Sequence, residues 1–175
     1  VFNAIHGTPG VDGLMQAYFE LLGIPQTSCD YYQAALTFNK RDLLSVLKPY
    51  GIKTATSYYL NKGDHIDTSE IVNKVGLPCF VKPNKSGSSF GISKVKTAAE
   101  LPIAIEVAYK EDNEIIIESF LDGTEVSVGV INYQGKDYEL RPFSEWEFAP
   151  KVSDFMDELK RGNEQDPHHW NKRIV

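Results

Sequence analysis

The chain has 175 residues, of which 42% are hydrophobic and 11% aromatic, and its formal net charge is −6. This size and composition are typical of one or two compact domains with a buried core and exclude a wholly disordered chain. The negative charge argues against general binding to nucleic acid or to an anionic membrane surface, and no apolar run reaches membrane-spanning length. Cys29 and Cys79 lack metal-ligand spacing, so two reduced thiols in a cytoplasmic protein are the simplest interpretation.

The first 36 residues favour part of an α/β domain. The apolar run "VFNAI" predicts a core strand, and "HGTPGVDG" predicts a loop after it. Asp12 then precedes a helix with one apolar face, and a second strand is expected to run into Cys29. The residues of that face are Leu14, Tyr18, Leu21 and Leu22. Strand, loop and helix in this order predict parallel strands with a ligand site at their carboxyl ends. The sequence opens inside an expected strand and without a signal peptide, so we expect a portion of a longer protein.

Residues 37–150 predict a second region in which helices alternate with strands. Helices are expected over residues 39–47, 67–76 and 102–109, the last with Thr97 and Glu100 at capping-box spacing just before it. Strands are expected near residues 54–60, 78–83, 91–96 and 113–121, the last nearly all apolar and buried on both faces. An alternating pattern over 124–140 predicts a hairpin that turns at Gln134-Gly135. Residues 151–175 predict a helix followed by an irregular tail.

The stretch "KPNKSGSSFGISKV" between two of these strands is the main candidate for chemistry. It lacks the P-loop pattern, and a strand follows it rather than a helix. The setting is typical of a glycine-rich flap that closes over nucleotide phosphates. Gly87 would let the backbone approach a ligand, Ser88 and Ser89 would donate hydroxyl hydrogens, and Lys82 would supply positive charge. A mobile polar hairpin is the alternative interpretation.

Three further residues also favour a nucleotide-binding site. Lys40 falls in the first turn of an expected helix, where a cation opposes the helix dipole, so a bound phosphate would offset the penalty. Glu118 ends an apolar strand and needs a partner there, and Glu125 follows an Asp-Gly turn. Two such carboxylates suit an adenine amino group and ribose hydroxyls. Taken singly, each of the three is also typical of an ordinary surface or sheet-edge residue.

Together these elements resemble the D-alanine–D-alanine ligase family of the ATP-grasp superfamily. The resemblance covers about residues 1–133 and rests on His6-Gly7, Gly10, Asp12-Gly13, Asn39-Lys40, Lys82-Pro83, Gly87 to Ser89, Gly91, Ser93 to Val95, Glu118, Gly123 and Glu125. It implies an α/β fold of the α+β ATP-grasp type. In that fold, a partial N-terminal α/β unit with parallel strands precedes a nucleotide-binding region with a mixed or antiparallel sheet.

The resemblance also implies a role for each matching residue. Lys40 and Lys82 would bind ATP phosphates, and Gly87 and Ser89 would cover them. Ser88 would close the site through a hydrogen-bond network and, with Lys82, serve catalysis. The remaining assignments are Glu118, Phe120 and Leu121 for adenine, Glu125 for ribose, and His6 beside the first D-alanine. The family uses ATP and Mg²⁺ to join two D-alanines for peptidoglycan synthesis, in the cytoplasm and as a homodimer.

Two departures from the family pattern limit this expectation. Val11 stands where the family has glutamate, and no magnesium ligands are recognisable in the sequence. Two alternatives therefore stay open. One is an ATP-grasp ligase with a different substrate, and the other is a non-catalytic nucleotide-binding or interaction module.

Overall fold

The computed structural model describes residues 1–124, 126–128, 130–133, 136–139 and 143–144. The chain divides into two units, residues 1–121 and residues 122–175. The boundary predicted at residue 36 stays a prediction.

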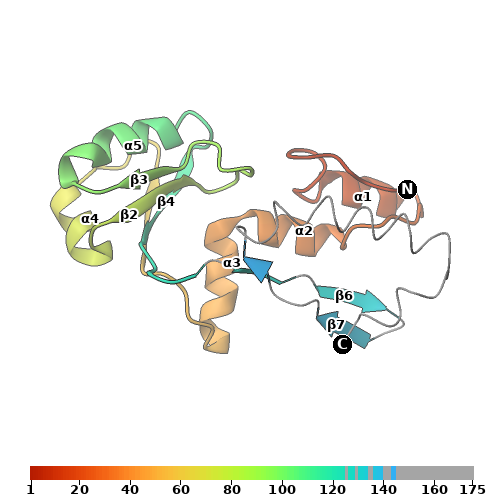
Figure 1. The fold of residues 1–175 in the computed structure, drawn as a ribbon. Helices are drawn as coiled ribbons and strands as arrows, with labels where there is room; N and C mark the ends of the chain where they lie inside the picture. The colour runs from red at the N-terminus through yellow and green to blue at the C-terminus, as the bar shows by residue number, and fades with distance from the viewer. Residues whose placement is uncertain (125, 129, 134–135, 140–142, 145–175) are drawn as a thin grey trace. The chain divides into compact units, whose positions relative to one another are not determined.

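A four-stranded antiparallel sheet forms the centre of the first unit. Its strands are β1 (Ser57–Asn61), β4 (Glu114–Ser119), β2 (Cys79–Pro83) and β3 (Ser93–Val95), in the order β1-β4-β2-β3. Each neighbouring pair is antiparallel. The two strands predicted to flank the glycine-rich stretch are therefore confirmed, and the loop at residues 84–92 joins one sheet neighbour to the next (Figure 1).

Two helices cover one face of this sheet. They are α4 (Thr68–Val75) and α5 (Leu101–Ala108). Helix α4 begins at the Asp67 cap, whose carboxylate accepts from the backbone N–H groups of Ser69 and Glu70. Before α5, a short 3₁₀ turn spans Ala98–Glu100, and the Thr97 hydroxyl donates to Glu100 across 2.9 Å. Both predicted helices are confirmed.

The core lies between these helices and the sheet. Strand β4 is its centre, since Ile115, Ile116 and Ile117 are all inaccessible to solvent. That confirms the strand predicted to be buried on both faces. Packed with Ile115 and Ile117 are Leu60, Ile71, Val75, Cys79, Val81, Val95, Leu101, Ala104, Ile105 and Ala108. Cys79 is a free buried thiol and Cys29 a free exposed one, as the sequence predicts.

The segment before the sheet differs from the prediction. It holds three helices, α1 (Leu14–Leu21), α2 (Tyr31–Phe38) and α3 (Lys40–Leu47), the last followed by a 3₁₀ turn over Lys48–Tyr50. Residues 1–6 form no strand, and the described residues contain no parallel N-terminal strands. The prediction of a parallel α/β unit is therefore wrong for the described residues. A strand needs a hydrogen-bonded neighbour, and the side chain of Phe2 is 80% exposed, so the apolar run is neither paired nor packed here.

The helices of this segment correct two further expectations. The predicted apolar face of α1 is exposed, and its buried residue is Gln16, whose side-chain amide donates to the Gly10 carbonyl across 2.8 Å. The strand expected to run into Cys29 is absent, since residues 24–29 form no strand. Asp30 caps the start of α2 instead, its carboxylate accepting from the Gln33 N–H. The helix predicted at residues 39–47 is confirmed as α3.

In the second unit, short strands pair locally. Strand β5 (Val126–Ser127) pairs with β8 (Phe143–Ser144), and β6 (Val130–Tyr133) pairs with β7 (Lys136–Glu139). The pairing of Tyr133 with Lys136 agrees with the predicted hairpin, whose turn residues lie outside the described residues. The predicted tail helix and Glu125 also lie outside them. Among the residues described, no helix is long and apolar enough to cross a membrane.

Candidate functional site

The loop at residues 84–92 has an unusual backbone. Ser88 and Ser89 are both left-handed, with φ of 50° and 59°, a conformation that costs energy for residues other than glycine. Gly91 has φ of +70°, and a Cβ atom there would lie 2.7 Å from side-chain carbons of Glu111 and Pro83. Only glycine fits this position without a shift of its neighbours. The loop thus holds a defined, strained shape that presents two exposed serines.

Lys40 joins this loop from the first turn of α3. Its ammonium donates hydrogen bonds to the carbonyls of Asn84 at 3.1 Å and Ser86 at 2.8 Å. Burial lowers the pKa of Lys40, and the positive charge of Lys82 lowers it further. The two lysines are therefore close enough to repel each other. A pair of cations beside a glycine-containing loop is an arrangement that attracts a polyvalent anion.

Lys82 forms an ion pair with Glu118. The two residues lie on the neighbouring strands β2 and β4, and the lysine nitrogen is 2.7 Å from the carboxylate oxygen. The Glu118 side chain is 14% exposed, so this cation meets the need of a largely buried carboxylate for a partner. Burial alternates along β2, with Val81 and Pro83 buried and Phe80 and Lys82 half-buried, so the latter two face away from the helices.

An aromatic cluster adjoins this ion pair. The rings of Phe80 and Phe120 are 6.1 Å apart, and the Lys94 nitrogen lies 3.9 Å from the centre of the Phe120 ring. Leu121 is next in the chain and 68% exposed. Phe80 and Lys94 were not among the site residues predicted from the sequence. The sequence signal for Phe80 is its position two residues before Lys82, which places both side chains on one face of a strand. Its pairing with Lys94 follows from the register of β2 and β3.

His6 faces the same loop across a pocket. An open pocket of about 280 Å³ is lined on one side by His6, Gly7 and Thr8. Gly87 and Ser88 line it from the loop, together with Lys85, Ser86 and Phe90, and Phe38 and Glu111 complete it. The structure therefore brings the predicted substrate-side histidine and the predicted loop residues to one pocket.

Most of the predicted site residues lie in the first unit. Lys40 contacts the loop through the carbonyls of Asn84 and Ser86, and Lys82 pairs with Glu118. Ser88 lines the pocket with His6. Glu125 lies outside the described residues. Within the described ranges, no group of three or more His, Cys, Asp or Glu side chains is arranged to hold a metal ion.

The chain is similar in structure to solved ligases. The chain superposes on the D-alanine–D-alanine ligase of Helicobacter pylori with a TM-score of 0.74 at 26% identity, covering 84% of this chain and 45% of that one. It superposes on the VanG D-Ala:D-Ser ligase of Enterococcus faecalis with a TM-score of 0.75 at 36% identity, covering 81% and 41%. The mixed α/β architecture with its four-stranded antiparallel sheet is thus that of the ATP-grasp ligases.

Sequence relatives narrow this class to one family. Residues 46–167 match the family model described as the D-ala D-ala ligase C-terminus. The chain is 89% identical to the D-alanine–D-alanine ligase of Flavobacterium johnsoniae and 73% identical to that of Christiangramia forsetii, each over 136 residues. These matches cover 78% of this chain and 42% of each relative. The chain belongs to the D-alanine–D-alanine ligase family, and it spans less than half the length of these relatives.

Proposed function

We propose that the chain supplies the nucleotide-binding part of an ATP-dependent carboxylate–amine ligase that joins two D-alanines for peptidoglycan precursor synthesis. Lys40, Lys82 and the loop at residues 84–92 form this part, the nucleotide clamp. Membership of the family supports the proposal, as do relatives that are themselves D-alanine–D-alanine ligases. The observation that carries it is the convergence of Lys40, Lys82 and the strained loop on one place.

In this proposal the cations and the loop hold the triphosphate. Lys40 and Lys82 bind phosphate oxygens, and the backbone at Gly87 and the hydroxyls of Ser88 and Ser89 cover them. Binding frees Lys82 from Glu118, because the ammonium exchanges a carboxylate for a phosphate. Glu118 then accepts from the adenine amino group. Phe120 and Leu121 line the base, Glu125 holds the ribose, and His6 lies beside the first D-alanine.

The reaction proceeds in two transfers. The γ-phosphoryl group of ATP passes to a carboxylate oxygen of the first D-alanine, and ADP leaves. The amine of the second D-alanine then attacks the acyl carbon, and inorganic phosphate leaves as the amide forms. Lys82 and Ser88 contribute by neutralising and orienting the phosphates, which is the main protein contribution to such transfers. Magnesium belongs to the proposal through the family alone. Family membership is likewise the basis for proposing that the protein is a cytoplasmic homodimer.

Nucleotide binding is the first test. Isothermal titration of the full chain with ATP, with and without Mg²⁺, is expected to detect binding that Lys82→Ala weakens by about tenfold or more. A hydrogen bond to a charged group contributes about 1.5–3 kcal/mol, which corresponds to at least that factor. Lys53→Ala removes an exposed lysine elsewhere and serves as the matched control. Absence of binding, or equal binding by wild type and Lys82→Ala, would refute the clamp.

A ligase with a different second substrate is the alternative that one observation favours. The structurally similar VanG protein is a D-Ala:D-Ser ligase. In this chain, Val11 stands where the pattern of the D-alanine enzymes has glutamate. Phosphate release from ATP with D-alanine alone, or with D-alanine plus D-serine, separates the two ligases. A non-catalytic nucleotide-binding module would release no phosphate with either.

A further inference from the structure

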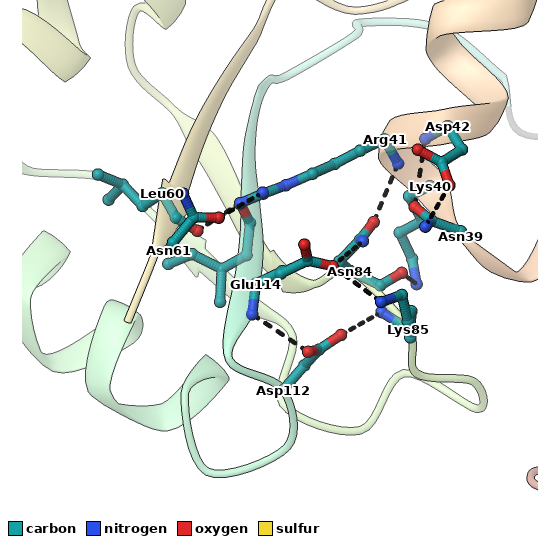
Figure 2. Close-up of polar contacts among 11 residues, drawn as sticks. Asn39, Lys40, Arg41, Asp42, Leu60, Asn61, Asn84, Lys85, Asp112 and Glu114 are labelled. Carbon is teal, nitrogen blue, oxygen red and sulfur yellow. Dashed lines mark hydrogen bonds and ion pairs between the residues drawn. The ribbon is translucent and has the colours of Figure 1, made fainter. Parts of the chain in front are cut away.

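Asn84 connects the loop to both of its neighbours. It is the first residue after β2 and is 1% exposed. Its side-chain oxygen accepts from the Arg41 backbone N–H at 2.9 Å, and its side-chain amide donates to Glu114 at 3.0 Å. Its backbone N–H donates to the Glu114 carbonyl at 2.9 Å, and its carbonyl accepts from the Lys40 ammonium at 3.1 Å (Figure 2). All of its polar groups thus act at the junction of α3, β4 and the loop.

Arg41 ties the same turn of α3 to the sheet. Its guanidinium donates to the side-chain oxygen of Asn61 at 2.8 Å and to the carbonyls of Leu60 and Ile115. Leu60 and Ile115 are directly paired in the register of β1 and β4, so one guanidinium nitrogen bridges the two strands. Figure 2 shows the Arg41 guanidinium beside Leu60 and Asn61. The guanidinium also lies 5.1 Å from the centre of the Tyr59 ring.

These polar ties matter because α3 lacks a fully buried side chain. It is eight residues long, and its leucines are only half-buried. Apolar burial is the usual means of fixing a helix on a sheet, and here it is incomplete. Lys40 precedes Arg41 directly, so the direction of its ammonium depends on how this first turn is held.

We propose that Arg41 and Asn84 are positioning residues for Lys40. They hold its ammonium at the entrance of the loop at residues 84–92, ready for the phosphates of a nucleoside triphosphate. The inference rests on the proposed function, since it assigns Lys40 to phosphate binding. It adds that the contribution of Lys40 to affinity depends on two residues that touch no phosphate themselves. Pre-organising the lysine removes an ordering cost that binding would otherwise carry.

A double-mutant cycle tests this dependence. The ATP dissociation constant of the full chain is measured for wild type, Arg41→Gln, Lys40→Ala and the double variant. Arg41→Gln is expected to weaken ATP binding about tenfold in the wild-type background and by less than about twofold when Lys40 is already absent. A merely structural role would weaken binding equally in both backgrounds, and that result would overturn the proposal.

Two further variants complete the test. Arg41→Lys keeps the charge but loses the forked donors, and it is expected to restore only part of the affinity. Asn84→Ser repeats the cycle from the loop side, with circular dichroism reporting the fold, so the outcome does not depend on Arg41→Gln folding. Asn73→Ser, an exposed asparagine on α4, is the matched control. If wild type fails to bind ATP, or Lys40→Ala changes nothing, the proposed function itself fails, whereas full binding by Arg41→Gln overturns only the positioning role.

Discussion

Glu114 illustrates how single side chains at the loop are held. Its carboxylate lies 2.9 Å from the Lys85 ammonium and accepts from the Asn84 amide. These two partners hold the pKa of Glu114 below its ordinary value of 4.5. Because the pKa is lower in the folded state, the carboxylate contributes stability above the unfolded-state pKa and loses it as pH falls through the lowered value.

Glu114→Gln is therefore expected to destabilise the chain at pH 7 and much less under acid conditions. The effect at pH 7 should stay below about 1 kcal/mol, since the ion pair is partly exposed and screened by solvent. Urea unfolding of wild type and variant at pH 7 and at about pH 3 measures the difference. Glu106→Gln, an exposed acid on α5, is the control. A difference between wild type and Glu114→Gln that does not change with pH would contradict this account.

At the scale of helices and strands, the predictions that were confirmed rest on signals that are local in the sequence. The helix after Asp67 and the strand around Val81 were predicted correctly, because the cap and the alternation of burial are local in the sequence. The strand at residues 1–5 was wrong because a strand depends on a neighbour that the pattern does not reveal. Helix α2 was missed although Asp30 stands before it as a helix cap, a signal that the sequence does contain.

The candidate site also contains residues that the sequence predicts and contacts that it does not. Lys40, Lys82 and Glu118 were predicted, since a lysine in a first helical turn and a carboxylate in an apolar strand are visible anomalies. The contacts of Arg41 could not be predicted, because they reach Leu60 and Ile115, which are 19 and 74 residues away. Phe80 was missed because an aromatic residue in a strand is ordinary until the register places it beside Lys94.

The shape of the loop at residues 84–92 depends on Gly91. Gly91→Ala is expected to destabilise the chain more than Gly63→Ala, because both positions have positive φ but only Gly91 has atoms in the way of a Cβ. The backbone cost is about 1–2 kcal/mol at each position, and the contact at Gly91 adds to it. Urea unfolding of both variants measures the difference. Equal destabilisation by the two substitutions would mean that the loop relaxes around the new methyl group without cost.

At the scale of the whole molecule, ligand binding and folding are linked. Except for Glu125, the proposed ATP-binding residues lie in residues 1–121, which form one unit. A nucleotide that binds only the folded state raises its stability by an amount set by the ratio of ligand concentration to dissociation constant. Lys40 makes this linkage measurable, because its ammonium contacts the loop and its loss is expected to weaken ATP binding about tenfold.

ATP at 100 times its dissociation constant is therefore expected to raise the free energy of unfolding by about 2.7 kcal/mol. For Lys40→Ala at the same ATP concentration, a tenfold weaker site gives an increase of only about 1.4 kcal/mol. Urea unfolding with and without ATP measures both values, and Lys53→Ala should behave as wild type. An equal increase in wild type and Lys40→Ala would show that ATP binds away from Lys40. No increase in either would mean that the folded chain does not bind ATP in preference to the unfolded chain, and would count against the clamp as a whole.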